Sequence, residues 1–304
     1  MAVLMLDRVV KRFGEFTAVD ELSFSVPEGG VFGFLGGNGA GKTTSLRMVL
    51  DILRPTTGTI EVLGKPPSRE NSTQLGFLPE ERGLYRRMTV LDTVVYFGRL
   101  KGMKRDAARK SAMALIERFD LVPWARQAVD KLSKGMSQKV QLAAALVNAP
   151  RLVILDEPFS GLDPLNQDIL EDVVRELARN GSTVVFSTHI MQHAERLCDR
   201  MLFLARGRKV FEGGQEDARR AVPARLTMVS RVSPIGLPGV SRVSLAESLA
   251  DGWNLWDVGL APDVVPGDIL EICTAQSFPL RDFTVHSPSL HDVFLRLVGP
   301  GNGR

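Results

Sequence analysis

Residues 36–44, which read GGNGAGKTT, have the types and the spacing that bind phosphate groups. The apolar run VFGFL precedes them and the pattern SLRMVLDIL follows, so a strand, a loop and a helix are expected in turn. Glycines let the backbone curl until its N–H groups converge on phosphate oxygens, with the Lys42 ammonium on the outer phosphates and the Thr43 hydroxyl on Mg²⁺. The segment predicts a nucleoside triphosphate site made by Gly36, Gly37, Asn38, Gly39, Ala40, Gly41, Lys42, Thr43 and Thr44.

Two carboxylates follow a second short apolar run. In RLVILDEPFSGLDP, residues 152–155 are expected to form a buried strand, and Asp156 and Glu157 come directly after it. In open parallel sheets, ligands bind outside the carboxyl ends of the strands. Asp156 is therefore a candidate to hold Mg²⁺, directly or through water, and Glu157 to orient or deprotonate an attacking water. The pair predicts hydrolysis of the bound triphosphate.

A third apolar run, STVVFSTHI at 182–190, contains His189 near its end. A histidine at this edge of a sheet can donate a hydrogen bond to a terminal phosphate and sense its loss. His193 follows four residues later, at the spacing of a metal pair on a helix, but no third ligand is evident. We therefore assign His189 to the phosphate and interpret His193 as a surface residue.

The stretch LSKGMSQKVQ, residues 132–141, predicts the start of an amphipathic helix, with Val140, Leu142, Leu146 and Val147 on its apolar face. Backbone N–H groups at such a start have no partner inside the helix. They can bind an anion, because the helix dipole also favours negative charge there. Since residues 36–44 already provide a phosphate site, the question is which anion this second start faces.

Size and composition limit the classes of protein to which the chain can belong. Its 304 residues, 44% of them hydrophobic, allow one large domain with a small one, or two medium domains. The net charge of +3 is too small to indicate a nucleic-acid partner, and Cys198 and Cys273 favour a reducing compartment. No charge-free apolar run reaches the roughly 18 residues that span a bilayer, and the start MAVLMLDRVVKRF lacks a secretory pattern. A cytoplasmic location is expected, with any membrane role exerted through a partner.

Charge is distributed unevenly along the chain. Residues 1–220 hold 32 Lys and Arg against 27 acids, whereas residues 221–304 hold six Arg, no Lys and eight acids. This break predicts a domain boundary near residue 220, with FEGGQEDARR before it as the candidate linker. Alternating runs and a helical pattern after it predict a small α+β unit, in which His286 and His291 have no obvious partners.

Together these segments resemble the ATPase subunit of ATP-binding cassette (ABC) transporters. The motifs GGNGAGKTT, LSKGM, LVILDEP, SGLD and STH stand in the family's order, and the resemblance covers roughly residues 2–220. It implies an α/β fold, a P-loop NTPase core with a parallel sheet, an antiparallel β subdomain and a helical subdomain; a small accessory α+β domain would occupy residues 221–301. It also implies that the chain binds ATP and Mg²⁺, and that a separately encoded transmembrane permease uses the hydrolysis for transport and holds the chain at the inner face of the membrane.

The resemblance answers the question raised by residues 132–141. In this family two subunits, identical or paralogous, pair head to tail around two ATP molecules. The LSKGM segment stands at the signature position, so Ser133 and Gly135 would face the γ-phosphate that the other subunit holds. Asp163 of SGLD would bridge the two subunits near the nucleotide.

Several residues depart from the family's usual pattern. Gly37 replaces a common proline, and Lys134 and Met136 replace a glycine and a glutamine of the signature. Glu80, in LPEERGLY, stands where a glutamine usually contacts Mg²⁺ and the attacking water; a carboxylate can still ligate Mg²⁺, so we take Glu80 as a working variant. Phe13 falls at the position where the family carries an aromatic residue that stacks on adenine. The alternative interpretation is that the Phe13 ring is packed in the hydrophobic core.

LPEERGLY and the closing PSLHDVFLRLVG resemble a bacterial branch of type-two ABC exporters, which makes export the expected direction. The basic segment 82–110, with nine Lys and Arg against two acids, either lies near anionic lipid headgroups or is a solvated helix face. The alternative function is a soluble ABC ATPase that acts on nucleic acid or ribosomes. A single phosphate loop and the lack of a coiled-coil insertion disfavour it, and Glu157 and His189 disfavour a non-hydrolysing nucleotide switch.

Overall fold

The computed structural model describes residues 2–68, 70–81, 83–222, 225–261 and 264–299. The chain forms two compact units, which meet between Gly214 and Gln215. The division falls six residues before the predicted boundary. The predicted linker FEGGQEDARR is not an irregular segment, because it contains the end of strand β9 (Arg208–Gly213) and helix α7 (Gln215–Arg220).

A six-stranded sheet forms the centre of the first unit. Its strands lie in the order β5 (Leu75–Leu78), β6 (Leu152–Asp156), β7 (Thr183–Thr188), β3 (Val31–Gly36), β8 (Arg200–Ala205) and β9. The first five are parallel and β9 is antiparallel to β8. Every residue of β3, β6 and β7 is buried, as expected for apolar parallel strands covered on both faces. The three predicted strands are thus confirmed, and their carboxyl ends share one edge.

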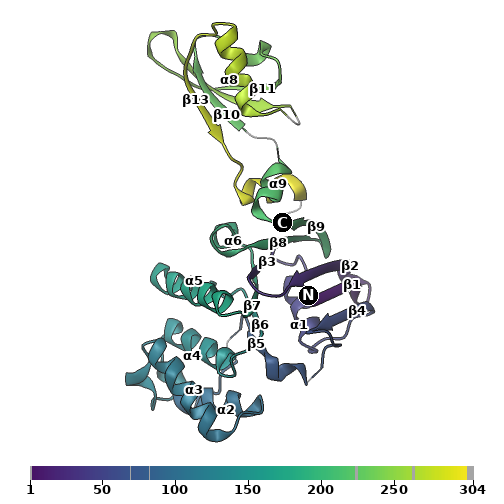
Figure 1. Cartoon of the computed structure of the whole chain (residues 1–304), viewed down its shortest axis with the longest axis vertical. Helices are drawn as coiled ribbons and strands as arrows, with labels where there is room; N and C mark the ends of the chain where they lie inside the picture. The colour runs from purple at the N-terminus through teal and green to yellow at the C-terminus, as the bar shows by residue number, and fades with distance from the viewer. Residues whose placement is uncertain (1, 69, 82, 223–224, 262–263, 300–304) are drawn as a thin grey trace. The chain divides into compact units, whose positions relative to one another are not determined.

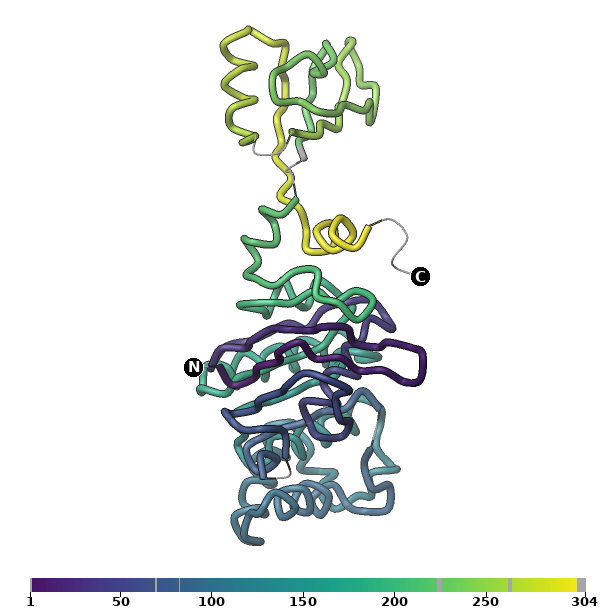
Figure 2. The backbone as a smooth tube through the Cα atoms, turned by 90° about the vertical axis from the view of Figure 1, so that its right-hand side faces the viewer, coloured from purple at the N-terminus to yellow at the C-terminus, as the bar shows by residue number. Residues whose placement is uncertain are grey.

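An antiparallel sheet of three strands packs beside this parallel sheet. It has the order β2 (Phe16–Pro27), β1 (Ala2–Phe13) and β4 (Thr57–Val62), and Figure 2 shows β1 and β2 side by side, joined by a tight turn. Phe24 of β2 stacks on Phe32 of β3 at 5.9 Å between ring centroids, and its ring lies 5.5 Å from that of Phe34. The shared core fixes the strand that leads into the phosphate loop.

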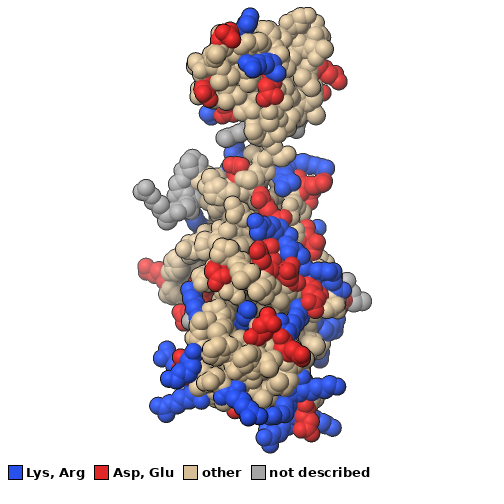
Figure 3. Space-filling model, turned by 90° about the vertical axis from the view of Figure 1, so that its left-hand side faces the viewer, with Lys and Arg blue, Asp and Glu red and all other residues tan. Residues whose placement is uncertain are grey.

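Most helices of the first unit lie to the left of and below the parallel sheet in Figure 1, and one lies between the two sheets. The helices are α1 (Lys42–Val49), α2 (Val90–Leu100), α3 (Arg105–Arg118), α4 (Lys134–Leu146), α5 (Pro164–Arg179) and α6 (Met191–Leu197). Helices α2, α3 and α4 pack on one another and form the helical subdomain. Lys and Arg gather at the lower end of Figure 3, where Figure 1 places α2 and α3, so the basic segment lies largely at the surface. No helix in the described ranges is long and apolar enough to cross a membrane.

Lys101, directly after α2, ties the helical subdomain to the sheet. Its Nζ donates to the carbonyl of Leu75 in β5 and, at 3.5 Å, to that of Ala145 in α4. No carboxylate of the described residues pairs with it, and burial lowers the pKa of Lys101 to about 8.

A pH dependence of stability follows from this lysine. Between pH 8 and 10.5 the unfolded chain binds a proton at Lys101 that the folded chain has released, so stability rises with pH. Relative to Lys101→Met, the wild type should gain about 3 kcal/mol across this window and show a constant difference below it. Urea unfolding at a series of pH values measures the difference, with Lys104→Met on the exposed surface as control. Parallel curves for wild type and Lys101→Met would mean that the ammonium is solvated in the folded chain.

The second unit is a small α+β structure, as the sequence predicts. Its antiparallel sheet has the order β11 (Val240–Ser248), β12 (Asn254–Leu260), β10 (Arg225–Ser230) and β13 (Leu280–His286). Helix α8 (Pro266–Ala275) contributes Ile269 and Cys273 to a core with Leu226, Met228 and Val258. Helix α9 (Leu290–Val298) packs against α7. His286 does have a partner, because its Nε2 lies 2.8 Å from Thr227 Oγ1 on the neighbouring strand.

Candidate functional site

Lys42 begins α1 and is buried at the carboxyl edge of the parallel sheet. Its Nζ lies 2.8 Å from the carbonyl oxygen of Gly36, 3.2 Å from that of Gly37 and 3.1 Å from Glu157 Oε1. An ammonium has three protons, so these acceptors satisfy it completely. Lys42 is thus paired with Glu157 and curls back onto its own loop.

Two glycines of the phosphate loop are required by its close packing. Gly41 has φ of +102°, and a Cβ there would come within 2.6 Å of the carbonyl oxygen of Ala18. A Cβ on Gly36 would overlap the carbonyl oxygen of Leu204 in β8. Gly37 has open space around it, so its lack of a side chain is not required by packing. Asn38 and Gly39 are exposed at the tip of the loop.

Asp156, the last residue of β6, brings an oxygen to the start of α1. Its Oδ1 accepts a hydrogen bond from Thr43 Oγ1 at 3.2 Å and one from Ser187 Oγ at 2.6 Å. The carboxylate and the Thr43 hydroxyl are hard oxygen ligands of the kind that Mg²⁺ prefers, and phosphate and water supply the remainder of such a shell. The residues present therefore fit the ion, with Thr43 and Asp156 as the candidate protein ligands.

Glu157 is held in a strained backbone conformation directly after β6. Its φ is +46°, in the left-handed region that a glutamate rarely adopts. Its N–H donates to Ser187 Oγ at 2.9 Å, and its Oε2 lies 2.9 Å from His189 Nδ1. Nδ1 of His189 thus faces Glu157, and Nε2 is left for another partner. The carboxylate is thus fixed between Lys42 and His189.

Ser187 joins the two acidic residues, and the sequence reasoning missed it. The side chain is fully buried in β7, where it donates to Asp156 and accepts from the N–H of Glu157. A signal for it was present: serine is an unusual residue in the otherwise apolar run TVVFST. A buried hydroxyl in such a strand requires a polar partner on its neighbour.

Glu80 lies at the same edge, two residues after β5. Together with Glu81, Glu157 and Lys134 it lines a cavity of about 310 Å³. Its side chain is exposed, and the neighbouring Arg82 of LPEERGLY lies outside the described residues. The structure therefore brings Glu80 near Glu157, as the sequence predicts, without a hydrogen bond between the two carboxylates.

The predicted helix start at Ser133 is confirmed. Ser133 Oγ accepts from the N–H of Met136 at 3.3 Å and caps α4. The first turn of α4 also contacts the loop after Glu157 in the same chain: Lys134 lies against Gly161, and Gln138 Nε2 donates to the carbonyl of Pro158. The start of α4 therefore contacts the segment that follows Glu157.

Asp163 caps α5 in the same manner. Its Oδ1 accepts from the N–H of Asn166 at 3.0 Å, and its Oδ2 accepts from Asn166 Nδ2 at 2.7 Å. These hydrogen bonds hold the pKa of Asp163 below its usual range, so it is ionised at neutral pH. A Cβ on Gly135 would lie 3.1 Å from the same Asn166 Nδ2. Gly135 and Asp163, which the resemblance assigns to the subunit interface, are thus neighbours through Asn166.

The interpretation of His193 as a surface residue is wrong. Its side chain is 7% exposed, and its ring stacks on Phe159 at 4.0 Å between centroids and an angle of 9°. Its Nδ1 lies 3.3 Å from Glu171 Oε1 of α5. The face of α6 that bears His193 packs on α5, which a single sequence window does not show. Through its stacking on Phe159, His193 therefore packs against the segment that follows Glu157.

Phe13 is 48% exposed at the end of β1, so the core alternative for this ring is wrong. Lys11 Nζ lies 5.0 Å from the centre of the ring. Five residues later, Ala18 contacts the phosphate loop at Gly41. An exposed ring on this strand is free to stack on a planar ligand.

Comparisons with known proteins identify the family of this chain. A family model described as ABC transporter matches residues 19–160. The chain is 39% identical over 298 residues to the uncharacterised ABC transporter ATP-binding protein YhaQ of Bacillus subtilis, over 98% of this chain and 99% of YhaQ. It is 42% identical over 303 residues to the Nod factor export ATP-binding protein I of Burkholderia lata, over 96% and 95% of the two chains.

Solved structures show the same fold. An ATP-binding subunit of an ABC transporter matches with a TM-score of 0.67 and 29% identity, over 72% of this chain and 92% of that chain. The predicted α/β fold with its parallel sheet is confirmed. The chain belongs to the family of ABC transporter ATP-binding subunits, which bind ATP and couple its hydrolysis to transport.

Proposed function

We propose that this chain is the ATPase subunit of an exporter, and that it dimerises head to tail around Mg·ATP and drives a separately encoded permease. The observation that carries the proposal is the cluster of Lys42, Glu157 and His189 at the carboxyl edge of the sheet. Export as the direction is supported by the relatives that are named Nod factor export ATP-binding proteins.

The contacts of Lys42 suggest how ATP engages the site. The ammonium is shared between two loop carbonyls and Glu157. Phosphate oxygens carry more negative charge than carbonyls, so Lys42 turns to the β- and γ-phosphates when ATP enters. Glu157 is thereby released from its ion pair and becomes available to a water molecule. ATP binding and activation of the base are coupled through one lysine.

Hydrolysis then uses the residues around Glu157. The carboxylate accepts a hydrogen bond from a water and takes its proton as the water oxygen bonds to the γ-phosphorus and the bond to the β–γ bridging oxygen breaks, leaving ADP and phosphate. Ser187 keeps the Glu157 backbone in place, and His189 orients the carboxylate through Nδ1 and stabilises the γ-phosphate. Thr43 and Asp156 would hold Mg²⁺, which would supply positive charge beside the phosphates.

The remaining site residues belong to binding and to the dimer. Phe13 stacks on adenine, and the amides of Gly36 to Thr44 surround the phosphates. Ser133 and Gly135 at the start of α4 face the γ-phosphate held by the other subunit, while Asp163 bridges the interface. The contacts of α4 with the loop at Pro158 and Gly161 link the signature segment to the residues after Glu157 within one chain.

The second unit is proposed to be an accessory domain that regulates or stabilises the dimer. The sequence predicts residues 221–301 as this domain. In the structure the second unit begins earlier along the chain, at Gln215, because it includes α7. The domain is proposed to mark the sodium- and drug-export-like branch of type-two exporters. The chain is proposed to work at the inner face of the membrane, where its permease holds it.

A pull-down of the tagged chain in mild detergent tests the partner. A polytopic membrane protein in stoichiometric amount is expected. Recovery with ribosomes or DNA, and with no membrane protein, would support the alternative of an ABC ATPase that acts on nucleic acid or ribosomes. The same pull-down is repeated with a Glu157→Gln chain in the presence of ATP. The variant should bind the same membrane protein in its nucleotide-bound state.

Glu80 is proposed to serve as a functional replacement of the usual glutamine. Because its side chain is exposed and forms no hydrogen bond or ion pair with a described residue that an amide would lose, Glu80→Gln should retain ATP turnover within about threefold. Steady-state phosphate release measures this, with Glu81→Gln as control. A loss as deep as that of Glu157→Gln would make Glu80 a catalytic residue.

A further inference from the structure

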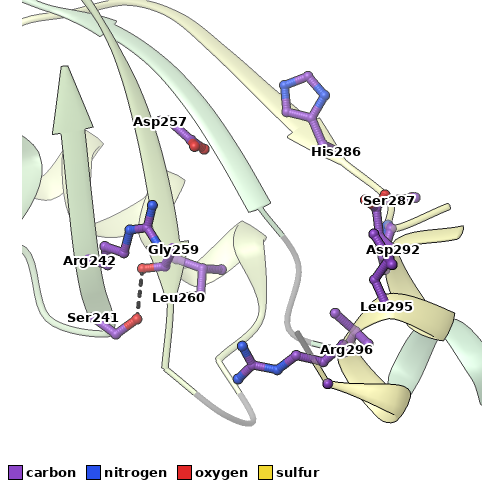
Figure 4. A pocket seen from close by; sticks show the side chains of 13 residues that line it. Ser241, Arg242, Asp257, Gly259, Leu260, His286, Ser287, Asp292, Leu295 and Arg296 are labelled. Carbon is purple, nitrogen blue, oxygen red and sulfur yellow. Dashed lines mark hydrogen bonds between the residues drawn. The ribbon is translucent and has the colours of Figure 1, made fainter. Parts of the chain in front are cut away.

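The second unit contains a cavity of about 590 Å³, and all the residues that line it belong to this unit. Its walls come from β11, β12, the end of β13 and α9 (Figure 4). The volume is within the range of pockets that bind small organic molecules. None of its residues has a role in ATP hydrolysis.

Two arginines from different elements line this cavity. Arg242 comes from β11 and Arg296 from α9, and Figure 4 shows the Arg296 side chain extending from the helix towards the sheet. Neither guanidinium forms a hydrogen bond or an ion pair with any residue in the described ranges. A guanidinium stays charged and offers five N–H donors in a planar fork that suits carboxylate and phosphate groups. The cavity therefore offers donors for an anion.

Two carboxylates also line the cavity and balance its formal charge, but neither is paired with Arg242 or Arg296, so the guanidinium donors stay available. Asp292 is used at the start of α9, where its Oδ2 accepts from the N–H of Ser289 at 3.1 Å and from its Oγ at 2.6 Å. Asp257 lies on β12 and forms no ion pair with either arginine. His286 adds a further polar atom, because Thr227 occupies only its Nε2.

The rest of the lining is apolar. Val222, Leu260, Pro288 and Leu295 contribute carbon surface. Leu295 is 52% exposed, although Leu290, Val293 and Val298 of the same helix are buried. A large apolar side chain that is left exposed beside an unpaired arginine favours a ligand with both an apolar and an anionic part.

We propose that this cavity binds a small amphipathic anion. A carboxylate, phosphate or sulfonate group lies between Arg242 and Arg296, and its apolar body covers Leu260 and Leu295. The ligand touches both the sheet and α9, so its binding holds these elements together and raises the thermal stability of the folded chain. This site is separate from the proposed ATP chemistry and stands or falls independently of it.

Fluorescence titration with 8-anilinonaphthalene-1-sulfonate, an aromatic sulfonate, tests the proposal on the full chain. ATP is present throughout to occupy the nucleotide site. Saturable binding is expected, and Arg242→Gln and Arg296→Gln should each weaken it by about fivefold or more, because each removes charged donors. Arg281→Gln, which removes an exposed charge of β13 outside the cavity, should leave it within about twofold. ATP turnover and the circular dichroism spectrum of each variant should match the wild type.

Unchanged probe binding in both cavity variants would overturn the proposal, and so would an equal loss in Arg281→Gln. Displacement of the probe by octyl phosphate at about one-tenth of the concentration of inorganic phosphate is expected from the apolar lining. Equal potency of the two would refute the apolar half of the site. Vesicles of phosphatidylglycerol distinguish a lipid headgroup from a free anion as the ligand. If the chain is retained on the vesicles and Arg242→Gln and Arg296→Gln abolish this retention, the ligand is a lipid headgroup. If octyl phosphate displaces the probe but the chain is not retained on the vesicles, the ligand is a free anion.

Discussion

Glu157→Gln is expected to lower the ATP turnover of this chain by about 100- to 1,000-fold while leaving ATP binding intact. The carboxylate is fixed by His189 and by its backbone bond to Ser187, and it gains access to water once Lys42 turns to the phosphates. An amide of the same shape keeps these contacts but takes no proton. Phosphate release measures turnover, and a fluorescent ATP analogue measures affinity.

The same variant tests the subunit arrangement. With hydrolysis blocked, ATP remains bound, and a dimer that depends on two ATP molecules should accumulate. Light scattering with ATP and Mg²⁺ should show twice the mass that it shows without nucleotide. Glu117→Gln, on the exposed surface of α3, serves as control and should behave as the wild type. If Glu157→Gln stays monomeric with bound ATP, the head-to-tail model is contradicted. If Glu157→Gln keeps a tenth of the wild-type ATP turnover, a residue other than Glu157 is the general base.

Lys42→Met is the second change with a large expected effect. It removes the charged donors for the outer phosphates, so ATP affinity should fall by about 10- to 100-fold. It also leaves Glu157, which is 9% exposed, without its cation. An unpaired buried group of this kind destabilises the fold by roughly 1–3 kcal/mol. Nucleotide titration and urea unfolding measure the two effects separately.

A double variant distinguishes the two roles of Lys42. Lys42→Met with Glu157→Gln removes both partners of the buried pair, so most of the lost stability should return while ATP affinity stays low. Lys110→Met, an exposed lysine of α3, should alter neither quantity. If Lys42→Met alone is as stable as the wild type, the Lys42–Glu157 pair is not held in the folded chain.

Much of the site was predictable because its residues are local in sequence. Residues 36–44, the pair Asp156 and Glu157, and His189 each follow directly after an apolar run, and parallel strands end at a common edge. The helix start at Ser133 was predictable for the same reason, since a cap depends on a few adjacent residues.

The positions that the sequence did not predict depend on contacts between distant segments. Ser187 meets Asp156 and Glu157 only because β6 and β7 are neighbours in the sheet. His193 was assigned to the surface, although α6 turns it onto Phe159 and Glu171. The segment FEGGQEDARR resembles a linker because of its Gly and charged residues. In the structure its first residues belong to β9, which pairs with β8, and its last six residues form α7.

The proposed chemistry of this protein follows from its residue types alone: a phosphate loop, two carboxylates and a histidine at strand ends, with a capped helix proposed as a second anion site. These features are set by residue types over short spacings, and local backbone geometry is sufficient to express them. Folding adds what the residue types do not show: Lys42 is paired with Glu157, Lys134 lies against Gly161, and Arg242 and Arg296 line one cavity. These pairings join segments that are tens of residues apart, and their distances depend on how the elements pack.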